Sequence, residues 1–173
     1  MRFVVTAEWS RNHLLQTIVA LYSLYVMGLW VTNALLYFHK MSLSYASVVE
    51  YYLGSEERFL SPRSYQGLLE VSHFHLFAVG MLLMVLTHLV LFVPLKNHWK
   101  GWLIAVPFLA ALLDEGAGWL ICFVHPGFAW AKIAGFLLLQ TSLLALVLLS
   151  LWAVFVGDQD NYETEDWPPL EDD

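Results

Sequence analysis

The residues of this chain best suited to chemistry are its seven histidines. Neutral imidazole is the commonest side-chain ligand of transition metals and a standard axial ligand of haem iron. Four of the histidines lie near the ends of hydrophobic segments that we expect to meet at one face of a membrane: His39, His73, His75 and His125. A fifth, His88, lies well inside a hydrophobic segment. This pattern favours a redox or metal site within a membrane.

Two adjacent carboxylates, Asp114 and Glu115, form a second group suited to chemistry, because they fall inside an apolar segment. An ionised carboxylate at that depth is costly unless it is protonated or paired. We expect no lysine or arginine from another segment to reach the same depth. Asp114 is therefore predicted to be neutral and hydrogen-bonded to His88, Asn33 or Gln140, or to face a water-filled cavity. Protonatable groups of this kind serve as relays beside quinol sites and in transporters.

Membrane-spanning helices must position these residues, because 59% of the chain is hydrophobic and the mean hydropathy is +0.61. Four stretches are long enough for the roughly 20 helical residues that cross a bilayer. Their apolar runs are uninterrupted and lack the alternation of β-barrel strands. The first stretch is longer than the apolar part of a cleavable signal peptide, so we expect it to be retained. We predict an all-α four-helix bundle over residues 1–157, with spans at about 14–38, 74–95, 102–124 and 128–156.

The segment between the first two spans, residues 41–72, is predicted to form a short helical cap. One interpretation is an interfacial helix held at headgroup depth by its tyrosines. The other is that Glu50, Glu70 and Tyr52 line an entrance for a quinone or for protons. Residues 158–173 hold eight of the fifteen acidic residues and are predicted to be a solvated, disordered tail, or else a docking peptide for a basic partner.

The distribution of lysine and arginine sets the predicted orientation. With four spans, each side of the membrane receives four of these residues: Arg2, Arg11, Lys96 and Lys100 on one side, and Lys40, Arg58, Arg63 and Lys132 on the other. The first four are concentrated in short segments flanking the spans, which favours cytoplasmic N- and C-termini in a bacterial inner membrane. The histidine-rich end then faces the periplasm.

The histidine-rich end is predicted to hold a b-type haem. In this interpretation His73 or His75 ligates the iron together with His125, and His39 is a substitute ligand. Cys122 is the single cysteine, so the chain has no Cys-x-x-Cys-His motif for covalent c-type haem. A haem would therefore be held by coordination and packing alone.

Two segments carry a family resemblance: Glu70-Val71-Ser72-His73-Phe74-His75-Leu76-Phe77 and Asp114-Glu115-Gly116-Ala117-Gly118-Trp119. Over most of its length, the chain resembles small bacterial four-helix inner-membrane proteins whose second helix starts with His-x-His-Leu-Phe. By topology and histidines it is also similar to the membrane subunits that carry b-type haem for respiratory enzymes. The second resemblance implies haem binding and electron transport.

We therefore predict a membrane electron-transfer subunit that binds haem b, quinone or both, and that performs no substrate turnover by itself. It would pass electrons between the quinone pool and a partner redox protein, with His88 and Asp114 handling protons or the quinone head group. One alternative is a cofactor-free accessory or assembly subunit. Another is a copper or zinc protein that uses His39, His73, His75 and His125. We expect membrane lipid and other redox subunits as partners, and no nucleic acid.

Overall fold

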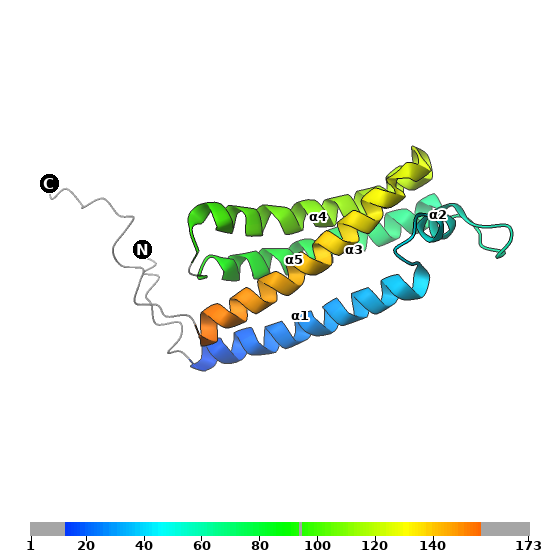
Figure 1. Ribbon diagram of the computed structural model, residues 1–173. Coiled ribbons are helices and arrows are strands. Elements are labelled where there is room, and N and C mark those ends of the chain that lie inside the picture. The colour runs from blue at the N-terminus through cyan, green and yellow to red at the C-terminus, as the bar shows by residue number, and fades with distance from the viewer. Residues whose placement is uncertain (1–12, 94, 157–173) are drawn as a thin grey trace.

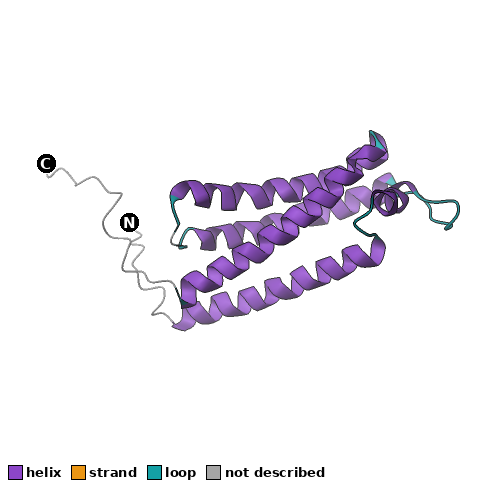
Figure 2. Ribbon diagram, viewed as in Figure 1, coloured by secondary structure: helices purple, strands orange, loops and turns teal. Residues whose placement is uncertain are grey.

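The computed structural model describes residues 13–93 and 95–156 of the chain. Its elements in order are α1 (His13–Lys40), α2 (Tyr45–Leu53), α3 (Tyr65–Val90), α4 (Asn97–Phe123), the short 3-10 turn η2 (Pro126–Phe128) and α5 (Ala129–Phe155). Helices account for most of the described chain (Figure 2), and the one strand-like pairing in those two ranges is a bridge between Ser55 and Leu60. The predicted all-α fold is confirmed. The predicted acidic tail, residues 158–173, lies outside the described residues.

Four of the helices, α1, α3, α4 and the α5 segment with η2, are long and apolar enough to cross a membrane. In its most apolar window, α5 has 44% of its residues buried within the protein, whereas α1 has only 17%. Most large apolar side chains of α1 are therefore exposed, as expected for a helix that faces lipid. The chain is a multi-pass membrane protein.

The bundle is organised around α5, which contacts α1, α3 and α4. Figure 1 shows α5 running obliquely across the bundle, with α1 on one side and the pair α3 and α4 on the other. The most extensive helix interface is that between α4 and α5, and α1 packs chiefly against α5. The short helix α2 lies at one end of the bundle, which we call the cap end, where it packs on α4 and α5.

Two clusters of buried side chains hold the helices together. The leucine core lies in the half away from α2 and is aliphatic: Val26, Leu83, Leu86, Val90, Ala110, Leu139, Leu143, Leu146 and Val147. The cap-end core is richer in aromatic side chains: Tyr37, Met41, Val48, Tyr52, Leu68, Ile121, Ala129, Ile133 and Phe136. Within the second cluster, the rings of Tyr37 and Phe136 stack with their centroids 3.7 Å apart.

Two helices begin well before the predicted spans. The second span is part of α3, which starts at Tyr65 and so includes the last residues of the predicted cap, 65–72. The Ser64 side chain caps this helix by accepting a hydrogen bond of 3.1 Å from Gly67 N, and no breaker interrupts the helix after it. In the same way α4 starts at Asn97 rather than near residue 102. At its other end, α3 stops at Val90, before the predicted end of the second span at residue 95.

The loop between α2 and α3 folds back against the end of α2. Gly54 adopts a positive φ of 83°, and a Cβ atom there would lie 2.6 Å from the carbonyl oxygen of Leu60. Arg63 N donates a hydrogen bond of 2.9 Å to Tyr52 O, which brings the start of α3 beside α2. Glycine at position 54 thus lets the loop close the cap end of the bundle.

Candidate functional site

A cavity of about 530 Å³, which we call the polar cavity, lies at the cap end, and all five α-helices contribute to its wall. It is larger than the other three cavities considered below. Its polar lining includes the following side chains: Asn33, Tyr37, Lys40, Tyr51, Tyr52, Arg63, Glu70, His75, Asp114, Glu115 and Lys132. This concentration of polar groups between membrane-spanning helices identifies the candidate site.

Asp114 forms an ion pair with Lys132, which corrects the prediction that no lysine or arginine reaches it. Lys132 Nζ lies 2.9 Å from Asp114 Oδ1, and both side chains are mostly buried. The ammonium Nζ also donates a hydrogen bond of 3.0 Å to the backbone carbonyl of Asp114. The predicted hydrogen bonds from His88, Asn33 or Gln140 are wrong, because the partner is a charged residue near the start of α5.

A glycine brings the two helices close enough for this pair. Gly135, three residues after Lys132, packs directly against the α4 backbone: a Cβ atom there would lie 2.7 Å from Asp114 N. Gly118, on α4, accepts the ring of Tyr52 in the same manner, with a Cβ atom placed 2.9 Å from Tyr52 Cε1. Burial raises the pKa of Tyr52 to about 12, so its hydroxyl stays protonated at neutral pH.

Glu115 lies at the centre of a directed hydrogen-bond chain. The Trp119 indole Nε1 donates to Ser72 Oγ at 2.7 Å, and Ser72 Oγ donates to Glu115 Oε1 at 2.5 Å. An indole N–H can only donate, so the single hydroxyl proton of Ser72 must point at the carboxylate. The other oxygen, Oε2, is 3.0 Å from His75 Nδ1. Glu115 is thus held as an acceptor from two sides.

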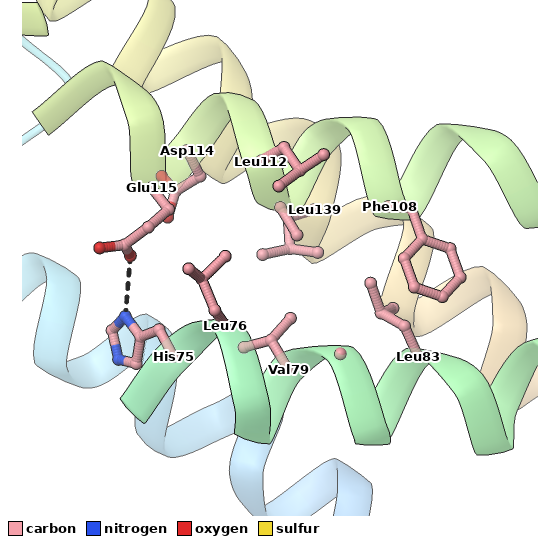
Figure 3. Close-up of a pocket in the computed structure, with 11 residues that line it drawn as sticks. His75, Leu76, Val79, Leu83, Phe108, Leu112, Asp114, Glu115 and Leu139 are labelled. Atoms are coloured by element: carbon pink, nitrogen blue, oxygen red, sulfur yellow. Dashed lines mark hydrogen bonds and ion pairs between the residues drawn. The ribbon is translucent and has the colours of Figure 1, made fainter. Parts of the chain in front are cut away.

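The contact with Glu115 orients the His75 ring. With Glu115 ionised, Oε2 accepts a hydrogen bond from Nδ1–H, which leaves the lone pair of the ring on Nε2. Among the described residues, Nε2 makes no hydrogen bond, and 54% of the His75 side chain is exposed. Figure 3 shows the ring reaching from α3 toward Glu115 on α4. The ring can therefore exchange a proton with a bound molecule.

An apolar cavity of about 270 Å³ adjoins this pair and is shown in Figure 3. It lies between α3 and α4, with one residue of α5, and it is lined by Leu76, Val79, Gly80, Leu83, Phe108, Ala111, Leu112 and Leu139 together with three polar residues. Those three, His75, Asp114 and Glu115, also line the polar cavity. The two cavities therefore meet at the ion-paired groups.

One buried polar atom of a residue that lines the polar cavity, Tyr37 Oη, has no hydrogen-bond partner within the described ranges. A buried hydroxyl left unsatisfied costs free energy, so such groups are normally hydrogen-bonded. Asp114 Oδ1, by contrast, lies beside the Lys132 ammonium.

The predicted ligand histidines do not gather at this site. His73 lines none of the four cavities, and His125 Nδ1 accepts a hydrogen bond of 2.9 Å from Gly127 N at the start of η2. His39 lines a cavity of about 230 Å³ between the end of α1 and α2. His88 lines a groove of about 390 Å³ between α1 and α3, toward the other end of the bundle. Of these histidines, His75 alone lines the polar cavity.

The residues therefore do not fit a haem with two histidine ligands from this chain, because none of the four cavities is lined by two histidines. In the part of the chain that the structure describes, no three His, Cys, Asp or Glu side chains are placed to hold one metal ion. The copper or zinc alternative thus gains no support from the geometry. Haem binding stays a prediction based on the histidine pattern.

The predicted cap acids have separate partners. Glu70 lines the polar cavity and accepts a hydrogen bond of 2.9 Å from Gln66 Nε2. Glu50 forms an ion pair of 3.2 Å with Arg58 and lines the cavity that contains His39 instead. Tyr52 lines the polar cavity, as the entrance interpretation requires. One of the two cap carboxylates therefore belongs to the candidate site.

Four residues of the site were not predicted as site residues from the sequence: Lys132, Ser72, Trp119 and Tyr37. Helical spacing contained a signal for two of them. Ser72 lies three residues before His75, and Trp119 lies four residues after Glu115, so each pair shares a helix face. Two faces that carry hydrogen-bonding groups inside a membrane are expected to pair with each other.

Comparison with known proteins gives one match, to a family described as a transmembrane helical domain, over residues 42–161. No curated protein and no solved structure matches the chain significantly. The matched segment contains α2, α3, α4 and α5, and with them His75, Asp114, Glu115 and Lys132. Because the match covers more than half of the chain and agrees with the four apolar helices, this protein belongs to that family of transmembrane helical domains.

Proposed function

We propose that this chain is a quinone-interacting electron-transfer subunit of a membrane redox complex. A quinone head group binds in the polar cavity, and a partner redox protein exchanges electrons with it. The observation that carries the proposal is the His75–Glu115 pair at the boundary between the polar and the apolar cavity. A lipid-soluble molecule with a small protonatable head suits such a site, since it needs mostly apolar walls and a few convergent polar groups.

The unsatisfied groups of the cavity match the hydrogen bonds of a quinone and a quinol. A quinone has two carbonyl oxygens that accept hydrogen bonds, and Tyr37 Oη is a buried donor without a partner among the described residues. A quinol has two hydroxyl groups that donate, and His75 Nε2 is an acceptor on the cavity wall. Binding would therefore supply the hydrogen bond that the buried Tyr37 hydroxyl lacks.

The proposed reaction balances as follows. Oxidation of one quinol to quinone releases two protons and two electrons. His75 Nε2 takes one proton, and Glu115 stabilises the resulting imidazolium, as a carboxylate does for the histidine of a catalytic triad. The second proton leaves to water through the polar cavity. The two electrons pass singly to one-electron acceptors of the partner protein, such as haem or an iron–sulfur cluster. Quinone reduction follows the same steps in reverse.

The proposed orientation in the membrane rests on the distribution of lysine and arginine between the two sides. With the termini in the bacterial cytoplasm, the cap end and the polar cavity face the periplasm, where the partner redox protein would dock. The protonation and binding steps above use only residues of this chain.

The test is equilibrium binding of tail-less benzoquinone and naphthoquinone head groups to the purified chain in lipid nanodiscs, measured by quenching of tryptophan emission. His75→Ala and Glu115→Gln should each weaken binding roughly tenfold, because each removes a hydrogen bond to a charged group. His73→Ala is the matched control: it removes an exposed histidine of the same helix that lines none of the four cavities. This variant should bind like the wild type.

Equal affinity of the wild type, His75→Ala and Glu115→Gln would overturn the proposed site. Failure of the wild-type chain to bind either head group would overturn the proposed function and favour an accessory subunit without a cofactor. A haem assay on the same preparation tests the haem prediction independently, since a b-type haem would give a sharpened α-band on reduction.

A further inference from the structure

We propose that the apolar cavity between α3 and α4 is the binding site for the isoprenoid tail of a long-chain quinone, which makes the natural ligand a prenylated quinone rather than a free head group. This inference rests on the proposed function, since it assigns the second part of the same ligand. It adds a specificity-determining position, Gly80, which lines the cavity.

The first support is that the two cavities share part of their lining. The apolar cavity shares His75, Asp114 and Glu115 with the polar cavity, so a head group in contact with these residues lies next to the apolar space. Figure 3 shows the lining side chains Leu76, Val79 and Leu83 following one another along α3, away from the His75–Glu115 pair. A chain attached to the head group would run along this row of residues.

The second support is the chemistry and shape of the lining. Besides the three shared polar residues, the lining consists of aliphatic and aromatic side chains and of Gly80, which has no side chain. A Cβ atom at Gly80 would meet nothing within 4 Å, so the glycine leaves space rather than a helix contact. Branched aliphatic walls with a gap at a glycine suit a methyl-branched chain, which gains packing contacts there that fluid lipid does not provide.

The competing location for a tail is the groove between α1 and α3 that contains His88. This groove has no residue in common with the polar cavity. Tyr22, which lines the groove, also donates a hydrogen bond of 3.2 Å to Leu82 O and so ties α1 to α3. A head group at His75 would therefore not lead directly into this groove.

The first experiment compares two glycine substitutions. Gly80→Leu fills the proposed tail cavity, and Gly28→Leu is the control, because a Cβ atom at Gly28 also meets nothing within 4 Å but the residue lines none of the four cavities. The measured quantity is the ratio of dissociation constants, as bilayer mole fractions, for tail-less quinone and for quinone with two isoprene units. In the wild type and in Gly28→Leu, we expect the tail-less quinone to bind roughly fivefold more weakly than the quinone with the tail, because the tail gains packing contacts. In Gly80→Leu the ratio should fall to about one, because those contacts are lost.

The second experiment localises the tail directly. A quinone with a diazirine on its second isoprene unit is irradiated in nanodiscs, and the labelled peptides are identified by mass spectrometry. Adducts on residues 76–83 of α3 and 108–112 of α4 are expected. A probe with the diazirine on the head group should label the segments around His75 and Glu115.

The outcomes separate the two proposals. Head-group labelling near His75 combined with tail labelling in the groove around His88 would overturn the tail site but leave the proposed function standing. An affinity ratio that Gly80→Leu does not change would do the same. Absence of both head-group labelling and head-group binding would overturn the proposed function itself.

Discussion

In the half of the bundle away from α2, the helices α3, α4 and α5 meet through the aliphatic side chains of the leucine core. In the cap-end half, the same three helices contribute to the polar cavity and are joined by the Lys132–Asp114 ion pair and the Glu115 hydrogen bonds. The apolar cavity lies between the two halves, since Leu83 and Leu139 of the leucine core line it together with Asp114 and Glu115. One half thus packs its helices through interchangeable apolar atoms, whereas the other depends on specific polar partners.

The two halves of the bundle are expected to differ in how well they tolerate amino-acid substitutions. Inside a membrane, apolar side chains gain little by leaving lipid, so packing and polar pairs must hold helices together. An aliphatic contact can be replaced by another of similar volume at small cost. A buried charge has no such substitute, because removing its partner leaves it uncompensated. The cap-end half should therefore be the more sensitive of the two.

The largest effect is expected from Lys132→Met, which leaves Asp114 without its cation. The free energy of unfolding, measured by denaturation in detergent micelles, should fall by about 3–5 kcal/mol. The double variant Lys132→Met with Asp114→Leu removes both charges and should recover most of this loss. A double variant no more stable than the single one would mean that the pair is not the cause.

A smaller loss is expected from Gly135→Ala, which places a methyl group against the backbone of Asp114. A backbone atom cannot move aside as a flexible side chain can, so α5 must shift away from α4 at a cost of about 1–3 kcal/mol. Gly116→Ala is the matched control, since a Cβ atom there meets nothing within 4 Å. Equal unfolding free energies for the two variants would refute the close helix contact.

In the leucine core, Leu146→Met should cost at most about 1.5 kcal/mol, because the volume is nearly conserved. It should also leave quinone affinity unchanged. The matched variant in the cap-end core is Phe136→Leu, which removes the ring that stacks on Tyr37 and should weaken binding of the head group. The free energy of unfolding and the affinity for the head group are measured for both variants. An equal loss of affinity in Leu146→Met and Phe136→Leu would contradict the predicted difference between the two halves.

The smallest effect at neutral pH is expected from ionisation of Tyr52, which changes stability only in alkaline solution. Burial raises the pKa of this hydroxyl to about 12 from a usual value of 10.0. Between these values the unfolded chain loses a proton that the folded chain keeps, so stability falls as pH rises. Tyr52→Phe should lose this part of the decline between pH 10 and 12. Unfolding curves at several alkaline pH values check the slope, and a slope equal to that of the wild type would contradict the assignment.

Most of the fold could be predicted because a bilayer allows few solutions. Long apolar runs must be helices, and their number follows from the length that spans the hydrocarbon. Helix ends were less accessible, since they depend on capping rather than hydropathy: Ser64 starts α3 well before the hydrocarbon segment begins. Hydropathy also contained no information on how α5 crosses the bundle.

The candidate site could be predicted in part. His75, Asp114 and Glu115 stand out because polar residues within apolar segments are rare and functional. Lys132 could not be found by counting charges, because a lysine close to a helix end is ordinarily interfacial, and its inward reach depends on the contact at Gly135. His125 caps a turn through its Nδ1, a role that requires only a loop position, and its predicted ligand role stays a prediction.

One consequence of the position of α1 concerns how the polar cavity is assembled. The family match begins at residue 42, so the Lys132–Asp114 and His75–Glu115 pairs lie within the matched segment, whereas Tyr37 and Asn33 come from a helix outside it. That helix packs chiefly against α5. The cavity thus joins the matched segment to a separate wall, and exchange of that wall alone would reshape the cavity while leaving both polar pairs in place.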